Sequence, residues 1–128
     1  MREILFKAKT CNGEWVQGLL AHKDNKWYIS NKAGQPFAFE VRPDTICQYT
    51  GLTDKNGNKI WENDIIKYIT NENTEPIGTV IWDKAEFRIT WKADRALRMD
   101  LFFWAEEREI KVIGNIFGNP ELLKEGAE

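Results

Sequence analysis

The stretch QYTGLTDKNGNKIWENDIIKY, residues 48–68, has the pattern of two strands joined by a polar loop. Near its end, Ile65 and Lys67 alternate with Ile66, the period of two that is typical of a strand. The loop contains Asn-Gly at 56–57, a pair that tolerates positive φ and favours tight turns. The stretch therefore predicts a hairpin. Its cluster of Asp and Asn side chains is either a well-formed turn or a binding site.

Calcium is the strongest metal hypothesis for this loop. Asp54, Asn56 and Asn58 stand at the alternating positions where an EF-hand loop places its first three oxygen ligands. The required glycine would then fall on Lys59 and the bidentate glutamate on Ile65, so the match fails. We therefore predict a turn, with neither a metal nor another cofactor.

The residues before this stretch alternate in the same way and predict a small antiparallel meander. Asn12-Gly13 is again a strong hairpin signal. Strands are expected at residues 4–9, 15–20, 27–30 and 37–41. Arg42-Pro43-Asp44 then breaks the pattern, because proline has no N–H to donate and restricts the residue before it. We expect an N-terminal β-rich subdomain at 1–43 and a C-terminal subdomain at 44–128.

Short apolar segments continue to the C-terminus. They predict strands at residues 46–50, 64–70, 77–83, 86–92 and 109–117. Residues 93–108 are expected to form a loop or helical turn that leads into a strand at 101–104, and Pro120 begins a single helical turn. Six Trp, seven Phe and three Tyr suit a pleated, half-buried surface. The predicted fold class is mainly β, with α+β as the alternative.

The composition restricts the class of protein. Lys and Arg number 18 and Asp and Glu number 20 in 128 residues, a balance that argues against an electrostatically driven nucleic-acid binder. Cys11 and Cys47 lack CxxC spacing and suggest a reducing cytosol. The longest apolar run, residues 101–105, is far shorter than the roughly 20 residues that span a bilayer. We expect a soluble cytoplasmic protein with no membrane segment.

Catalytic signatures are missing from the sequence. His22 is the single histidine and lies in a polar stretch, with neither cysteine nearby. Acidic pairs such as Glu62 and Asp64 are more often surface charges than acid/base groups. The chain contains no GxGxxG and no Walker lysine. The prediction is a protein that is not an enzyme.

One group of basic and aromatic residues allows a different function. Basic side chains stand close to tryptophans at Arg88, Trp91, Lys92, Arg95, Arg98 and Trp104. Such a combination could contact the backbone and bases of single-stranded nucleic acid. The same tryptophans could equally form an ordinary β core, and without a basic groove the core interpretation is favoured.

Three segments together resemble a known family. MREILFKAK at 1–9, the stretch at 48–68 and VIGNIFGNPELL at 112–123 are similar to the YopX proteins of bacteriophages and prophages. The resemblance implies a small SH3-like β-barrel in the C-terminal part, after an N-terminal piece. We expect the core of this barrel to include Ile65, Val80, Ile89, Val112 and Ile116. The family implies no established activity, so no catalytic residue is transferred.

The functional hypothesis is therefore a non-enzymatic interaction module encoded by a phage or prophage. SH3-like strands offer an edge or groove for a peptide, so the expected partner is a protein of the host or of the phage. Homo-oligomers are also expected, because an open sheet edge with surplus apolar surface is commonly covered by a partner. The alternative is an accessory protein that binds nucleic acid.

Overall fold

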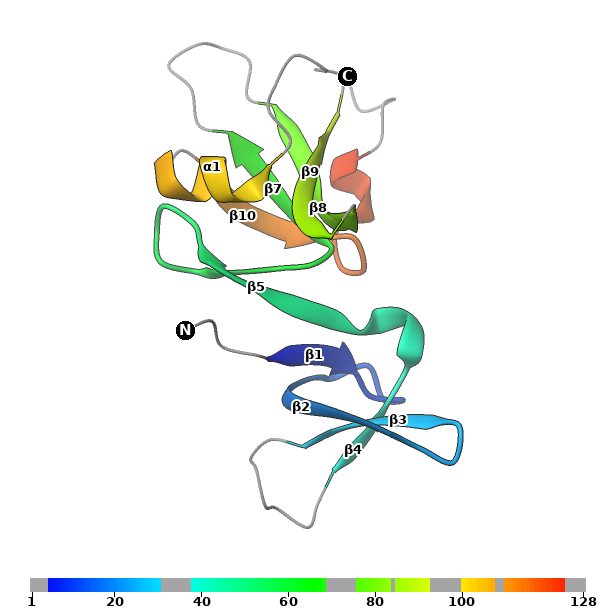
Figure 1. Cartoon of the computed structure of the whole chain (residues 1–128). Coiled ribbons are helices and arrows are strands. Elements are labelled where there is room, and N and C mark those ends of the chain that lie inside the picture. The colour runs from blue at the N-terminus through cyan, green and yellow to red at the C-terminus, as the bar shows by residue number, and fades with distance from the viewer. Residues whose placement is uncertain are drawn as a thin grey trace. The chain divides into compact units, whose positions relative to one another are not determined.

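The computed structural model describes residues 5–30, 38–68, 76–83, 85–92, 100–107 and 110–123. These residues form antiparallel sheets, two short 3₁₀ turns and one α-helix (Figure 1). The chain divides into two compact units, residues 1–51 and 52–128. The predicted mainly β fold class is confirmed.

The first unit is an antiparallel meander joined by one further strand. The meander consists of β1 (Phe6–Lys9), β2 (Trp15–Lys23), β3 (Lys26–Ser30) and β4 (Phe39–Val41), and the further strand is β5 (Cys47–Thr53). The strands lie in the order β4-β3-β2-β1-β5. The predicted N-terminal meander is therefore confirmed.

Local chemistry explains the two tight turns of the meander. Gly13 has a φ of 85° in the β1–β2 turn, where the hydroxyl oxygen of Thr10 accepts the N–H groups of Asn12 and Glu14. Asp24 and Asn25 join β2 to β3 with φ values of 54° and 66°. Two successive positive φ values match the right-handed twist of the flanking strands.

One face of the first sheet forms the core of this unit. Ala8, Ile29 and Val41 are buried, and other apolar side chains pack against them: Phe6, Val16, Leu20, Trp27 and Ile46. Successive residues of a strand point to opposite faces, so the even-numbered residues of β2 face this core and the odd-numbered ones face away.

The boundary between the units lies later than the predicted position after residue 43. Pro43–Thr45 form a 3₁₀ turn, η1, and the hydroxyl of Thr45 accepts the Lys9 N–H at 2.9 Å. Beyond this turn, Gln48 pairs with Phe6. Proline here bends the chain within one sheet instead of opening a linker, so the boundary falls inside β5.

The second unit contains a four-stranded antiparallel sheet. Its strands are β7 (Asp64–Tyr68), β8 (Ile77–Asp83), β9 (Glu86–Trp91) and β10 (Ile110–Asn115), in the order β10-β7-β8-β9. The short β6 (Lys59–Trp61) hydrogen-bonds to β5, and η2 (Pro120–Leu123) is a 3₁₀ turn. Over the described residues the four-stranded sheet is open, with β10 and β9 at its edges, and a closed barrel stays a prediction.

The segment after β9 differs from the prediction. Residues Leu101–Glu107 form the helix α1, where a strand was expected at 101–104. Leu101 and Trp104 are buried while Phe102 is exposed, the spacing of a helix with one buried face. The run of aromatic residues suggested a strand, but the helix places only one side of that run in the core.

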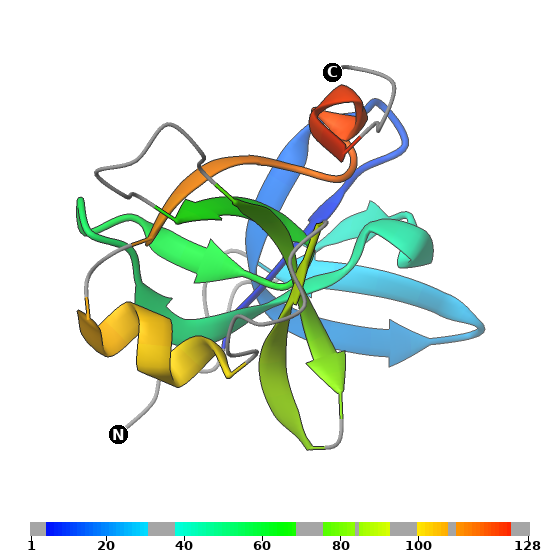
Figure 2. The ribbon, with the colours of Figure 1, turned by 90° about the horizontal axis from the view of Figure 1, so that it is seen from above.

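The core of the second unit lies between the sheet and α1. Leu101 and Trp104 pack with strand residues including Ile66, Val80 and Ile89. Figure 2 shows α1 and η2 on different sides of strands β7 to β9. Among the predicted core residues, Ile65, Val80 and Ile89 are fully buried, whereas Val112 and Ile116 are half-buried.

Candidate interaction surfaces

Asp54 organises the polar loop between β5 and β6. One carboxylate oxygen, Oδ1, accepts the backbone N–H groups of Asn56 and Asn58, both at 2.9 Å. The other, Oδ2, accepts the backbone N–H of Val112 at 2.9 Å and the Asn58 side-chain N–H at 3.4 Å. Gly57 has a φ of 83°, as a tight turn requires. The loop is a turn held by one buried carboxylate.

These donors also set the charge of Asp54. Burial alone would raise the pKa of its carboxyl, but the N–H groups of Val112, Asn58 and Asn56 lower the pKa below its ordinary value of 3.8. N–H groups stand where a cation would need the carboxylate oxygens. The geometry supports the turn interpretation, and the absence of a metal stays a prediction.

The C-terminal motif is a second turn built from side-chain oxygens. Asn115 Oδ1 accepts the N–H groups of Phe117 at 2.9 Å and Gly118 at 2.8 Å. A Cβ on Gly114 would lie 2.5 Å from Asn119 Oδ1, so the close approach of Asn119 requires glycine there. The polar residues of this motif therefore have structural roles.

The predicted basic and aromatic cluster is divided between the two faces of the second sheet. Trp91 and Trp104 are buried and pack edge to face, with ring centroids 5.4 Å apart. This placement matches the core interpretation and leaves neither ring an open face for a base. Arg95 and Arg98 lie outside the described residues.

Arg88 and Lys92 point to the opposite face from these tryptophans, because they alternate with Ile89 and Trp91 along the chain. The Arg88 guanidinium lies 3.5 Å from a Glu86 oxygen and 3.7 Å from an Asp83 oxygen. These two carboxylates offset its charge. Lys92 donates its backbone N–H to Ile77 at 2.8 Å.

The sheet brings two further lysines into register with Lys92. Lys67 of β7 lies directly opposite Lys111 of β10 and, on its other side, opposite Ile77 of β8. Lys92 lies beside Ile77, to which it donates its backbone N–H. Lys111, Lys67 and Lys92 therefore lie along one line across the strands, with Ile77 between Lys67 and Lys92. We call these three lysines the lysine row. Lys67 and Lys111 are like charges directly opposite one another, an arrangement that destabilises a sheet, so this pair with Lys92 nearby is a candidate for binding anions. Sequence reasoning missed it, because only strand register brings these distant residues together.

Large exposed aromatic side chains lie near β9. Trp82 is 51% exposed and stacks edge to face on Phe87, with centroids 4.8 Å apart. Asp100 forms a β-bridge with Arg88, the residue after Phe87, and Phe102 follows two positions later with 62% exposure. We call Trp82, Phe102 and the adjoining strand β9 the β9 edge.

Two reactive side chains of the first unit, His22 and Cys47, have local structural contacts. His22 stacks on Trp27, with ring centroids 4.2 Å apart. The Cys47 thiol is buried and donates to the Thr45 carbonyl at 3.3 Å, while Cys11 is exposed. In the parts of the chain that the structure describes, no helix has the length and apolar character needed to cross a membrane.

Comparison with known proteins identifies relatives without assigning an activity. A family model described as YopX protein matches residues 5–124. No curated protein matches the chain. The crystal structure of protein EF1440 from Enterococcus faecalis is similar, with a TM-score of 0.63 and 25% sequence identity, and the similarity covers 97% of this chain and 100% of that chain. Since the family model spans nearly the whole sequence, the chain belongs to the YopX protein family.

Proposed function

We propose that this YopX protein is a non-enzymatic module, encoded by a phage or prophage, that binds a protein in the cytoplasm of the bacterial host. The partner is a host or phage protein. The observation that carries the proposal is the β9 edge, where two large aromatic side chains lie beside an edge strand.

The composition of this edge suits protein recognition. Aromatic anchors dominate the affinity of many protein interfaces, and Trp82 and Phe102 supply two such side chains beside β9, whose outer edge is bridged at Arg88 by Asp100. Trp82 already rests on Phe87, so docking a partner there costs little additional side-chain entropy. A small SH3-like barrel in this unit is part of the proposal, because such barrels use edges and grooves in this way.

Affinity capture from a host lysate tests the proposal. The full chain is compared with the double variant Trp82→Ala, Phe102→Ala. The proteins that the wild type enriches should be lost with the double variant. Phe39→Ala is the matched control, since Phe39 is also an exposed aromatic residue but belongs to the first unit.

Equal capture by the wild type and the double variant would contradict a role for the β9 edge. Sedimentation at micromolar concentration completes the test, because an open edge can also bind a second copy of the chain. A self-associating wild type and a monomeric double variant would identify that second copy as the occupant.

Nucleic-acid binding is the second candidate, and the lysine row is the observation that favours it. A phosphate beside Lys67 and Lys111 would relieve the repulsion between these directly opposed side chains, and Lys92 would add a further cation along the same line. Arg88 contributes less, because Asp83 and Glu86 already face it. Titration with duplex and single-stranded oligonucleotides at low and moderate salt tests this candidate. Replacing the three lysines with glutamine should remove a binding that weakens steeply with salt.

A further inference from the structure

The face of the first sheet that points away from its core is open along β2. Its side chains are Trp15, Gln17, Leu19, Ala21 and Lys23, and all five are exposed. Trp15 and Leu19 are 36% and 47% exposed. Because β2 has β1 on one side and β3 on the other, this exposure is not that of an edge strand. We call these five residues and their cross-strand partners the open face.

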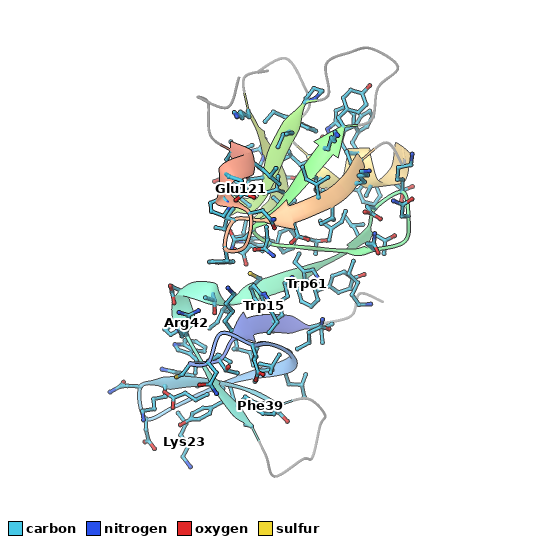
Figure 3. All side chains as sticks on the ribbon, turned by 180° about the vertical axis from the view of Figure 1, so that it is seen from behind. Trp15, Lys23, Phe39, Arg42, Trp61 and Glu121 are labelled. Atoms are coloured by element: carbon cyan, nitrogen blue, oxygen red, sulfur yellow. The ribbon has the colours of Figure 1, made fainter. Side chains whose placement is uncertain are left out.

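The charge of the open face is strongly positive. The register with β1 and β3 adds lysines to Lys23 of β2, so that the face carries Lys7, Lys9, Lys23 and Lys26. Among the strand residues that the structure describes on this face, Glu40 is the single acidic one. Its carboxylate oxygen Oε1 lies 4.0 Å from the Lys26 Nζ atom. Figure 3 labels Trp15 and Lys23, which mark the two ends of β2, about 26 Å apart at strand geometry.

Trp15 lies among these cations. The Nζ atoms of Lys7 and Lys9 are 4.8 Å and 5.5 Å from the centroid of its ring. Lys9 is the direct cross-strand partner of Trp15, and Lys7 is the partner of Gln17, whose amide can both donate and accept hydrogen bonds. An exposed indole, an amide and two ammonium groups therefore occupy neighbouring positions.

We propose that the open face binds single-stranded nucleic acid. Trp15 stacks on an unpaired base, and the lysines contact the phosphates on either side. An acidic protein would satisfy the lysines but would leave the exposed indole without a stacking partner, so the combination favours nucleic acid. Duplex bases are already stacked on one another, which favours a single strand. The inference goes beyond the proposed protein contact at the β9 edge and uses none of its residues.

Binding requires the lysines to move from the indole to phosphates. A cation–π contact at an exposed ring shifts the equilibrium toward the lysine lying over the ring by only about two- to fivefold. Stacking of one base on an aromatic side chain contributes about five- to 150-fold in affinity. The exchange is therefore favourable, and the cation contacts keep the lysines close to the position of the bound strand.

Fluorescence anisotropy of a labelled oligothymidylate of about 12 nucleotides tests the proposal on the full chain. Trp15→Ala should weaken binding about five- to 150-fold, whereas Trp15→Phe keeps an aromatic face and should retain most of the affinity. The double variant Lys7→Gln, Lys9→Gln should lower the slope of log affinity against log salt by about 1.4. If Trp15→Ala does not fold, as judged by circular dichroism, the lysine variant carries the test.

The matched control is Lys55→Gln with Lys59→Gln, which removes the same charge from exposed lysines of the second unit that belong to neither the lysine row nor the β9 edge. This variant should bind as the wild type does, and a duplex of the same length should bind more weakly than the single strand. The proposal is overturned if the wild type does not bind at low salt, if neither Trp15→Ala nor the Lys7 and Lys9 variant weakens binding, or if the control variant abolishes it. None of these outcomes bears on the proposed protein contact at the β9 edge, because protein capture tests that contact separately.

Discussion

The carboxylate of Asp54 stabilises both a turn and a strand that is distant in the sequence. Asp54 holds the loop backbone through the N–H groups of Asn56 and Asn58, and it also holds β10 through Val112. Burying a charge is unfavourable unless hydrogen bonds compensate for the lost water. The same donors that shape the loop provide this compensation, so turn and charge stabilise one another.

Replacing Asp54 with Ala should lower the free energy of unfolding by about 3 kcal/mol, because backbone N–H groups would lose a charged acceptor. Chemical denaturation measures the loss. Asn58→Ala is the control: it removes only the long 3.4 Å side-chain contact and should cost far less. A loss for Asp54→Ala no greater than that of the control would show that water replaces the carboxylate without penalty.

The stability should also depend on pH through Asp54. Since the folded state holds the pKa of this carboxyl below 3.8, the ionised form contributes stability that is present above that value. The contribution is lost as the pH falls through the folded-state pKa. The difference in free energy of unfolding between wild type and Asp54→Asn should therefore shrink between about pH 6 and about pH 2. A constant difference would contradict this linkage.

At the scale of the elements, the contact between β8 and β9 depends on a small residue. A Cβ on Gly78 would lie 2.5 Å from Ile89 Cγ2 and 3.1 Å from both the Thr90 carbonyl oxygen and a ring carbon of Trp91. The backbone oxygen cannot move without disturbing the pairing of β8 with β9.

Gly78→Ala should therefore lower the free energy of unfolding by about 2 kcal/mol through overpacking. Gly118→Ala is the matched control, because its Cβ would meet only Asn115 Oδ1, at an ordinary 3.6 Å. The control should change the stability by less than about 0.5 kcal/mol. Thermal or chemical unfolding of both variants gives the comparison, and equal effects would refute the packing argument.

Sequence reasoning succeeded where structure is locally determined. The turns at Asn12-Gly13 and Asn56-Gly57 follow from residues that accept positive φ, and both glycines have it. It failed for α1, where three successive aromatic residues concealed the helical spacing of Leu101 and Trp104. The lysine row and the open face depend on strand register, which no local pattern specifies.

At the scale of the whole molecule, β5 belongs to the fold of the first unit as much as the meander does. Tyr49 donates its backbone N–H to the Leu5 carbonyl at 2.8 Å, and Cys47 pairs with Lys7. A fragment of residues 1–53 should therefore fold, whereas a fragment of residues 1–43 should not, because β1 would lose its second neighbour. Circular dichroism and cooperative thermal unfolding distinguish the two. A folded 1–43 fragment would restore the boundary after Pro43.

The bond from Val112 to Asp54 joins residues 58 positions apart, and it has a consequence for synthesis on the ribosome. Chains emerge N-terminal end first, so the strands of the first unit are all available early in translation. Until residues 110–115 have been synthesised, Asp54 lacks its hydrogen-bond donor Val112, and β7 lacks its pairing partner β10. Before β10 emerges, a nascent chain therefore has a folded first unit and an incompletely folded second unit. A premature stop codon before Val112 would remove the hydrogen bond from Val112 to the turn at Asp54. The truncated product would then be a substrate for proteases.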